Sequence, residues 1–380
     1  MNFQPTEAQA ALCEEIRRFG RTLDAGLTAR EASGTLDRGL FQRCGEFGIQ
    51  GLPIPETYGG SGQDLTTAML AMEALGRACR DNGLVFSLNA QIWAVELPLL
   101  RFGTDGQRRR WLPALCSGSA IAAHAISEPG SGSDVMSMST RAVRDGDHYV
   151  LDGNKTFVTN GPIADLLLIF ATVDRSAGPA GITGFLVERD TPGLVLSPPI
   201  SKMGLRTSPM GEVALESCRI PVACRLGAEG AGSVVFSAAM EWERTCIFAS
   251  HLGAMERLLD ETVAYARERK QFGQPIARFT PVADQLVQMK IDIEAGRMLL
   301  YRVAEAKDRG EDAVMGAAIA KLFVSEAHVR QALAAIQIHG GYGYTSEFGI
   351  ERELRDAIPG TIYSGTSEMQ RKIIARLLGL

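Results

Sequence analysis

The sequence lacks the cysteine and histidine spacings that hold a metal or build a disulfide framework. Its seven cysteines are odd in number, scattered along the chain, and never form a C-x-x-C pair. They stand at Cys13, Cys44, Cys79, Cys116, Cys218, Cys224 and Cys246. The histidines include no H-x-x-x-H pair. These absences argue against a zinc site and a disulfide-stapled scaffold, so we predict no metal centre.

Long hydrophobic runs and strong charge of one sign are also missing. Residues 1–19 contain no apolar core of signal-peptide length, and no later run approaches about 18 apolar residues. Lys and Arg number 39 against 44 Asp and Glu, a net charge of −5, and the densest basic run covers only residues 108–110. We therefore expect a cytoplasmic protein that inserts into no membrane and binds no nucleic acid.

What is present is an ordinary globular composition, with 46 % hydrophobic and 22 % charged residues in a chain of 380. That length favours two or three domains. Helical spacing, as at Leu12, Ile16 and Phe19, marks residues 1–120. Short apolar runs bounded by Gly, Pro, Asp and Asn mark residues 121–230, and helical periodicity returns over 231–380.

This texture predicts an α+β fold of three domains. We expect an N-terminal helical domain (1–120), a middle antiparallel, barrel-like β domain (121–230) and a C-terminal four-helix domain (231–380). The helices of the last domain are expected near 233–268, 283–309, 312–338 and 366–378. No βαβ alternation and no G-x-G-x-x-G opening a helix are present, which disfavours a Rossmann domain.

Five polar or glycine-rich segments are candidates for chemistry. Each has an ordinary structural explanation by itself: a loop, a hairpin, a helix end, a connector and a capped helix start. They cover residues 125–134 (AISEPGSGSD), 151–161 (LDGNKTFVTNG), 268–273 (ERKQFG), 338–343 (IHGGYG) and 362–371 (IYSGTSEMQR).

The order and spacing of these segments closely resemble the acyl-CoA dehydrogenase family of FAD flavoproteins over essentially the whole chain. The resemblance implies FAD between the β domain and the C-terminal helices, in what is usually a homotetramer. It places the Ile126 backbone and Ser127 near the pyrimidine side of the flavin. Phe157 would stack on the ring where many members carry Trp, and the Thr159 hydroxyl would lie at flavin N5.

The same resemblance implies a second group of FAD contacts. Arg269, Gln271 and Phe272 would bind the diphosphate and adenosine of a neighbouring subunit's FAD. The residues implied to complete that site are Gln337, Gly341, Thr366 and Glu368. Ser133 would lie both at the cofactor and near the thioester tail of the substrate.

The catalytic base departs from the commonest family pattern. Many members carry a Glu directly before the Gly-Thr of the last segment, where this chain has Ser364. Other members, including isovaleryl- and long-chain-type enzymes, carry the base on the first long C-terminal helix directly before an Arg, and Glu243 precedes Arg244 here. A carboxylate within this mostly apolar helix also needs a reason. We therefore predict Glu243 as the base, with Glu241 as the fallback.

The predicted reaction is α,β-dehydrogenation of an acyl or aminoacyl thioester. Glu243 would take the α-proton while the β-hydrogen leaves as hydride to flavin N5. The thioester carbonyl would accept a hydrogen bond from the Ser364 backbone N–H, which survives the loss of a Glu side chain there. We expect Trp242, Arg244 and Gly365 to line the substrate.

The substrate class stays open between two carriers of the same phosphopantetheine arm. The segments around Trp242 and Ser364 look most like carrier-protein-directed members of natural-product pathways, such as prolyl-carrier-protein dehydrogenases. A short or branched acyl-CoA is the alternative substrate. Two other classes on this fold are an oxygen-using flavin oxidase or monooxygenase and a non-catalytic thioester binder. The electron acceptor would be an electron-transfer flavoprotein or O2.

Overall fold

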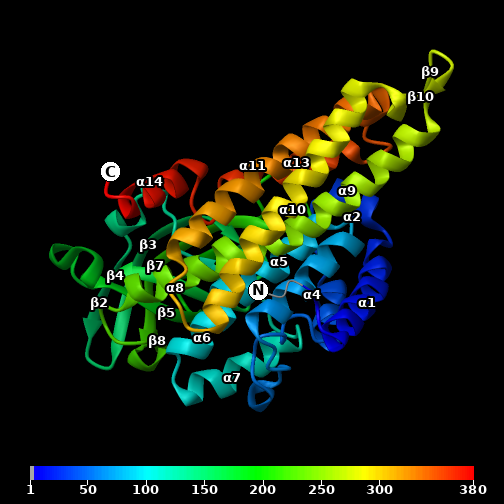
Figure 1. Cartoon of the computed structure of the whole chain (residues 1–380). Coiled ribbons are helices and arrows are strands. Elements are labelled where there is room, and N and C mark those ends of the chain that lie inside the picture. The colour runs from blue at the N-terminus through cyan, green and yellow to red at the C-terminus, as the bar shows by residue number, and fades with distance from the viewer. Residues whose placement is uncertain (1–3) are drawn as a thin grey trace.

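The computed structural model describes residues 4–380, so the first three residues of the predicted N-terminal domain lie outside it. The chain begins with helices, continues through a β sheet and returns to helices, as the sequence predicts (Figure 1). The helices before the sheet are α1 (Glu7–Arg21), α2 (Leu27–Ser33), α3 (Arg38–Glu46), α4 (Leu65–Ala78), α5 (Asn82–Gln91), α6 (Leu97–Phe102) and α7 (Asp105–Cys116). A π-helical turn, Ile92–Glu96, joins α5 to α6.

The middle of the chain forms an eight-stranded sheet. Its strands are β1 (Ala122–Ala125), β2 (Arg141–Asp145), β3 (His148–Thr159), β4 (Leu166–Thr172), β5 (Ile182–Glu188), β6 (Leu194–Leu196), β7 (Met210–Pro221) and β8 (Arg225–Leu226). The order is β6-β7-β3-β2-β4-β5-β8, and β1 pairs with β4 off this path. Most pairs are antiparallel, but β1 and β2 pair with β4 in parallel. The sheet is therefore mixed. β4 can run parallel to β1 and β2 because no hairpin connects it to either strand.

The central strand β4 is buried along its whole length because both faces of the sheet are covered. Leu166, Leu168 and Phe170 join the large core shared with the helices. The alternate residues of the strand, Leu167 and Ile169, join a second core with side chains of β3, β5 and β7. One face of the sheet thus packs against the helices.

Three of the C-terminal helices, α9, α10 and α11, are longer than any helix at the start of the chain. The C-terminal helices are α8 (Gly232–Trp242), α9 (Phe248–Glu268), α10 (Thr280–Asp308), α11 (Val314–His339), α12 (Gly341–Tyr344), α13 (Ile350–Ala357) and α14 (Ser367–Leu377). The expected helices near 233–268, 283–309, 312–338 and 366–378 are present, and α13 was not predicted. A short hairpin, β9 (Lys270–Gln271) with β10 (Gln274–Pro275), projects from the far end of the long helices (Figure 1).

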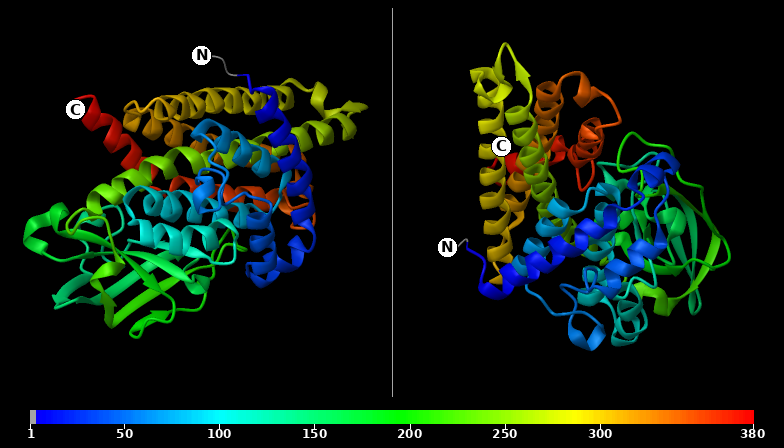
Figure 2. Two further views of the ribbon diagram at one scale, coloured as in Figure 1. Left: turned by 90° about the horizontal axis from the view of Figure 1, so that it is seen from below. Right: turned by 90° about the vertical axis from the view of Figure 1, so that its right-hand side faces the viewer.

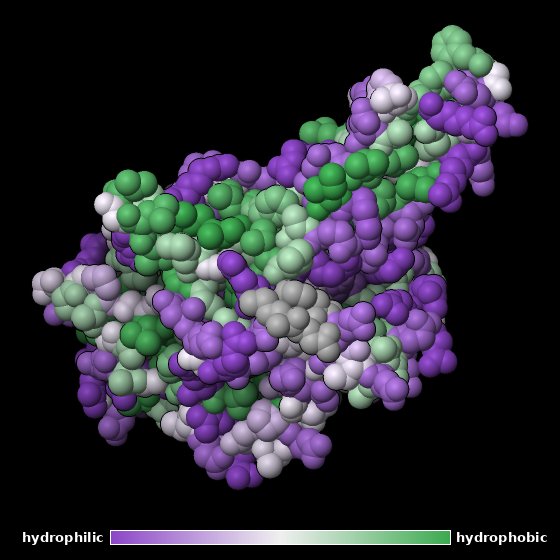
Figure 3. All heavy atoms as spheres, viewed as in Figure 1, coloured by the Kyte–Doolittle hydropathy of each residue, from purple (hydrophilic) through white to green (hydrophobic). Residues whose placement is uncertain are grey.

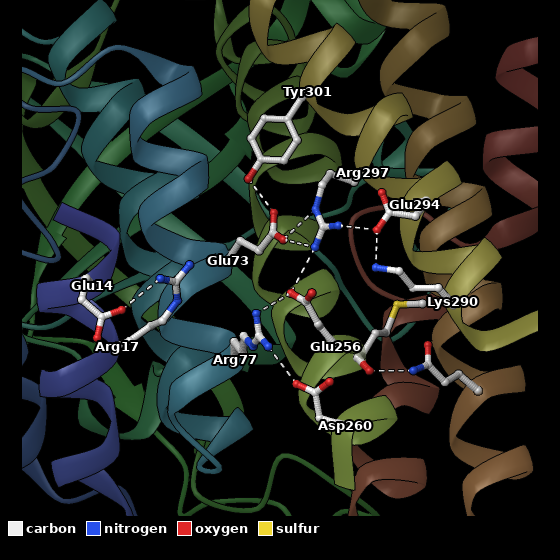
Figure 4. A network of polar contacts seen from close by, with 12 residues as sticks. Glu14, Arg17, Glu73, Arg77, Glu256, Asp260, Lys290, Glu294, Arg297 and Tyr301 are labelled. Atoms are coloured by element: carbon white, nitrogen blue, oxygen red, sulfur yellow. Dashed lines mark hydrogen bonds and ion pairs between the residues drawn. The ribbon is translucent and has the colours of Figure 1, made fainter. Parts of the chain in front are cut away.

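The two helical regions form one packed body that lies against the sheet (Figure 2). A charged network ties α4, α9 and α10 together (Figure 4). Arg297 on α10 pairs with Glu73 on α4 at 2.6 Å and with Glu256 on α9 at 3.1 Å. Tyr301 donates to the second oxygen of Glu73 at 2.6 Å. Side chains of both helical regions therefore fix the helices that carry Glu243.

One helical stretch of the described residues, Asn82–Phe102, is long and apolar enough to cross a membrane by length and composition alone. Within that stretch, 83 % of the 18-residue segment that meets this criterion is buried in the protein, as expected for a core helix. All seven cysteines are unpaired. Within residues 4–380, no group of three His, Cys, Asp or Glu side chains is arranged to hold a metal ion.

Candidate active site

Glu243 lies where a long helix changes its winding. The predicted continuous helix is interrupted by a π-helical turn, Glu243–Ile247, between α8 and α9. Such turns insert one extra residue and often occur at functional sites. The Thr245 hydroxyl donates to the Glu241 carbonyl at 3.0 Å and so satisfies part of the disturbed backbone. The turn leaves the Glu243 side chain in the interior, with 8 % of its surface exposed.

The environment of Glu243 favours a carboxyl that can exchange a proton near neutral pH. Burial raises the pKa of Glu243 to about 7, against the opposing effects of a hydrogen bond from Ser364 and the charge of Arg244. Ser364 Oγ donates to Glu243 Oε2 at 2.7 Å. The other oxygen, Oε1, has no hydrogen-bond partner among the described residues. One carboxyl oxygen is therefore held and the other is available to a ligand.

Ser364 lies in a segment that the surrounding side chains hold in an unusual conformation. Its φ of 53° is in the left-handed region, followed by Gly365 at 85°. The Ser364 carbonyl accepts from Arg244 Nε and Gln370 Nε2, both at 3.3 Å. Its backbone N–H has no acceptor within residues 4–380. That free donor belongs to the same residue as the hydroxyl that donates to Glu243.

The neighbours of Glu243 on the same helix have other partners. Glu241, the fallback base, forms an ion pair with Lys307 at 2.7 Å. The Trp242 ring lies 5.8 Å from the guanidinium of Arg101 and packs against the helical core. Trp242 therefore makes packing contacts in this chain, whereas Arg244 reaches the Ser364 carbonyl directly.

The β domain presents an exposed aromatic ring at a bulge. Pairing between β3 and β7 shifts register between Lys155 and Val158, and Phe157 lies at the shift with a φ of 57°. Its side chain is 64 % exposed. Thr159, two residues on, is half-buried at the end of the same strand. Phe157 therefore presents an exposed aromatic face at a strained position of the backbone.

A buried ion pair holds the loop that follows β1. Lys155 Nζ pairs with Glu128 Oε1 at 2.8 Å and donates to the Ile126 carbonyl at 3.1 Å. Burial raises the pKa of Glu128, but the bonds from Lys155, Ser139 and Thr140 outweigh it and lower the value to about 2. The Thr156 N–H donates to the Ser127 carbonyl at 2.9 Å. The first two candidate segments are thereby joined, while Ser133 is exposed further along the loop.

The third and fourth segments meet around a separate cavity. A volume of about 460 Å³ is lined by Arg269, Gln271, Gly341 and Tyr342, among others. The Arg269 guanidinium lies 5.9 Å from the Tyr342 ring and pairs with no carboxylate of the described residues. Phe272 is 93 % exposed at the tip of the β9–β10 hairpin. Gln337 is exposed near the same end of α11.

The structure divides the second group of predicted cofactor residues. Gln337 and Gly341 lie at the end of α11 near Arg269, but Thr366 and Glu368 begin α14 next to Ser364. Arg371 of α14 pairs with Glu326, which stands eleven residues before Gln337 on α11. At about 1.5 Å per residue this separates the two sets by about 16 Å along the helix. Thr366 and Glu368 therefore belong with the Glu243 site of the same chain.

Several residues near the site were not singled out from the sequence. The Tyr363 ring stacks near Phe86, with centroids 4.6 Å apart, and His251 Nε2 lies 2.5 Å from its hydroxyl. His251 Nδ1 in turn lies 2.9 Å from His328 Nδ1. The Ser364 hydroxyl was also missed, since only its backbone N–H was assigned. The position of Tyr363 and Ser364 inside a candidate segment was the one available signal; the histidines are far apart in the sequence.

Helices before and after a central β sheet give the chain a three-part architecture. Family models for acyl-CoA dehydrogenase match the N-terminal domain over residues 6–119, the middle domain over 123–218 and the C-terminal domain over 230–379. The chain belongs to the acyl-CoA dehydrogenase family.

Individual relatives and solved structures give a more specific similarity than the family models. The chain is 44 % identical to an L-prolyl-peptidyl-carrier-protein dehydrogenase of Pseudomonas fluorescens, covering 89 % of each chain. It is 49 % identical to the crystal structure of the prolyl acyl carrier protein oxidase AnaB, with a TM-score of 0.98, covering 99 % of this chain and 100 % of that one. The structure described as PigA with FAD and proline is 38 % identical, with a TM-score of 0.98 and full coverage of both chains.

Proposed function

We propose that this chain is a FAD-dependent dehydrogenase that introduces an α,β double bond into an aminoacyl thioester, of the prolyl type, tethered to a carrier protein. The observation that carries the proposal is the buried Glu243, whose pKa of about 7 suits a general base at neutral pH. The likeness to prolyl-carrier-protein relatives over the whole chain supports the substrate class. A natural-product pathway in the cytoplasm is the setting that this substrate implies.

The residues present fit FAD. Phe157 offers an exposed aromatic face beside Thr159, and the loop after β1 carries Gly130 and Gly132, where an added Cβ would meet open space. In the separate cavity, the cationic Arg269 lacks a carboxylate partner within the described residues, as a diphosphate site requires. Cβ atoms at Gly340 and Gly341 would also meet no neighbour within 4 Å. Bound FAD supplies the acceptor for the hydride that leaves the β-carbon.

The chain's own residues supply the proton chemistry. Glu243 Oε1 accepts the α-proton, and the C–H electron pair moves toward the thioester carbonyl. The free N–H of Ser364 is suited to donate to that carbonyl oxygen and stabilise the negative charge that develops on it. Arg244 and Gln370 fix this donor by binding the Ser364 carbonyl. Burial excludes the water that would otherwise weaken the base.

An anaerobic titration tests the proposed function. The purified holoprotein is mixed with prolyl and short acyl thioesters, each on a carrier protein and on CoA, and the flavin absorbance is followed. Bleaching by the carrier-bound prolyl thioester is the expected result. Bleaching by a short or branched acyl-CoA alone would identify a CoA thioester as the substrate and leave the proposed dehydrogenation unchanged. No bleaching by either set would contradict the dehydrogenase.

The second candidate function is an oxidase that passes the electrons to O2. It is favoured by the relative described as an oxidase, which is 49 % identical. Substrate-reduced protein is mixed with air-saturated buffer in a stopped-flow instrument. Reoxidation as fast as turnover would identify O2 as the acceptor. Slow reoxidation, accelerated by an electron-transfer flavoprotein, would identify that protein as the partner.

We also propose a homotetramer. The helix α10 carries exposed apolar side chains at Val287, Ile291 and Met298, which are 57 %, 53 % and 56 % exposed. Their spacing puts them on one side of the helix. Figure 3 displays apolar residues gathered over the long helices and the hairpin tip. Because the Arg269 cavity lies far from Glu243 in one chain, a neighbouring copy would bring the two FAD-contacting groups together.

A further inference from the structure

The hydroxyl of Ser364 is the one group that hydrogen bonds to the Glu243 carboxyl among residues 4–380. The bond runs from Oγ to Oε2 over 2.7 Å, and each residue exposes 8 % of its surface. A buried carboxylate with a single neutral donor depends strongly on that donor, because water does not replace it. The contact therefore affects the ionisation of Glu243 more than a surface hydrogen bond of the same length would.

The backbone around Ser364 is arranged to hold its side chain in place. A serine at a φ of 53° pays a conformational cost that persists only where neighbours enforce it. Two side chains from different helices enforce it here: Arg244 of the π turn and Gln370 of α14 bind the same carbonyl. Gln370 Nε2 also donates to the Gly365 carbonyl at 2.7 Å. Bonds from two elements thus fix the Ser364 backbone, which carries the hydroxyl bound to Glu243.

We propose that the Ser364 side chain is a positioning residue for Glu243. It holds Oε2, leaves Oε1 free for the α-proton, and favours the ionised carboxylate that removes it. This inference rests on the proposed function and assigns a role to the position where many relatives carry the base itself. In this chain the serine donates to a carboxylate that lies in a different element, the π turn between α8 and α9.

Few other groups can take over this role. Among the titratable and charged side chains of the π turn and of the elements that pack against it are Glu96, Glu241, Arg244, His251, Lys307, Asp308, Lys321 and His328, and Tyr363 lies directly before Ser364. Glu241 and Lys307 pair with each other, and the His251 ring bonds to Tyr363 and His328. Lys321 Nζ is buried and has no hydrogen-bond partner among residues 4–380. Arg244 opposes the effect of burial through its charge, but only Ser364 does so by a hydrogen bond to the carboxyl.

The test is the pH profile of flavin bleaching by a substrate that bleaches the wild-type holoprotein. The wild-type rate should rise with pH through about 7 and then level, because the ionised Glu243 is the active form. In Ser364→Ala the midpoint should move up by about one pH unit, so the rate well below the midpoint falls about tenfold. Ser364→Gly lacks the same hydroxyl but relieves the backbone, and should show the same shift.

Ser367→Ala is the matched control, since Ser367 is also buried and its hydroxyl has no hydrogen-bond partner among residues 4–380. It should keep the wild-type midpoint. If Ser364→Ala keeps the wild-type midpoint, the proposal is overturned, because the missing hydroxyl then has no effect. The same holds if Ser364→Ala shifts the midpoint but Ser364→Gly does not. Glu243→Gln distinguishes failure of the proposed base from failure of the positioning role. If Glu243→Gln bleaches normally, Glu243 is not the base and that part of the proposed function fails; if it is inactive and Ser364→Ala has the wild-type midpoint, only the positioning role of Ser364 fails.

Discussion

At the scale of single residues, Glu243 and Ser364 show how two unremarkable positions become a site. Neither a helical Glu nor a Ser before Gly-Thr has a distinctive spacing in the sequence. The fold places them 2.7 Å apart in a nearly closed interior. The consequences of that contact are testable in the two ways that follow.

Glu243→Gln should lower the rate of flavin bleaching by about 10³-fold, the usual contribution of a general base. Gln is close in size to Glu, can accept from the Ser364 hydroxyl, and should leave FAD bound. Glu241→Gln is the matched control, because it removes a carboxylate two residues away that is paired with Lys307. The two variants are compared by stopped-flow absorbance under anaerobic conditions. Loss of bleaching in Glu241→Gln but not in Glu243→Gln would reverse the assignment.

The same carboxyl should make folding stability depend on pH. Its pKa is raised from 4.5 to about 7 in the folded protein, so the folded state binds the proton more tightly than the unfolded state. This contribution is complete below about pH 4.5 and is lost as the pH rises through 7. Between pH 4.5 and 8 the free energy of unfolding should therefore fall by about 3 kcal/mol more in the wild-type holoprotein than in Glu243→Gln. Urea unfolding at both pH values measures the difference, and parallel curves would contradict it.

At the scale of elements, charge pairs and glycines decide how the pieces fit. The Lys155–Glu128 pair joins β3 to the loop after β1. Glycines let α4 and α9 approach each other closely: a Cβ at Gly253 would lie 2.0 Å from the Glu73 carbonyl oxygen. Both features are buried, so a single substitution at either one should lower the stability of the protein strongly.

Lys155→Met should destabilise the holoprotein by about 3–5 kcal/mol, because it leaves Glu128 buried without its cation. The loop that carries Ile126 and Ser127 loses its anchor, so FAD should also dissociate more readily. Arg110→Met at the exposed Arg110–Glu188 pair is the matched control and should cost less than about 1 kcal/mol. Denaturant midpoints and flavin retention on gel filtration report both effects. Equal losses in the two variants would show that burial of the pair is unimportant.

Gly253→Ala should destabilise the protein by about 2–3 kcal/mol, because the new methyl group collides with the backbone of α4. Gly106→Ala is the contrasting variant. Gly106 is exposed in the first turn of α7, with no atom closer than 4.0 Å to an added Cβ, and should gain about 0.5–1 kcal/mol. Thermal unfolding of the two variants beside the wild type tests both signs. A neutral Gly253→Ala would mean that α4 and α9 separate without cost.

At the scale of the whole molecule, the distance between the two FAD-contacting groups makes assembly part of the proposed activity. The Glu243 site lies at the π turn, which packs against α5, α10 and α11, and the Arg269 cavity includes Gln271 of the projecting hairpin (Figure 1). Under the proposed function, one chain offers two partial FAD sites, and the apolar side of α10 is the surface proposed for contact with a second copy.

Val287→Glu with Ile291→Glu should dissociate the assembly and release FAD, since charges would be buried in an apolar contact. Sedimentation velocity measures the mass, and the ratio of flavin to protein absorbance measures occupancy. Val143→Glu, on the exposed side of β2 and 53 % exposed in the wild type, should change neither quantity. A dissociated protein that keeps its flavin would contradict a cofactor site shared between copies.

Local periodicity determined the α, β, α order of the chain. Helical spacing at Leu12, Ile16 and Phe19 and the short apolar runs of the middle region each report on neighbours within a few residues, which is what a sequence records directly. The resemblance to the family then indicated Glu243 and the FAD-contacting residues. These predictions needed no knowledge of which distant residues touch.

Tertiary structure alone decided the rest, because each remaining feature joins residues far apart in the chain. The Ser364 hydroxyl meets Glu243 across 121 positions, and the parallel pairing of β1 with β4 depends on the crossover between them. The separation of Thr366 and Glu368 from Gln337 depends on where α14 packs along α11. The π turn at Glu243 has no periodic signal, since one extra residue in a turn matters only through the packing around it.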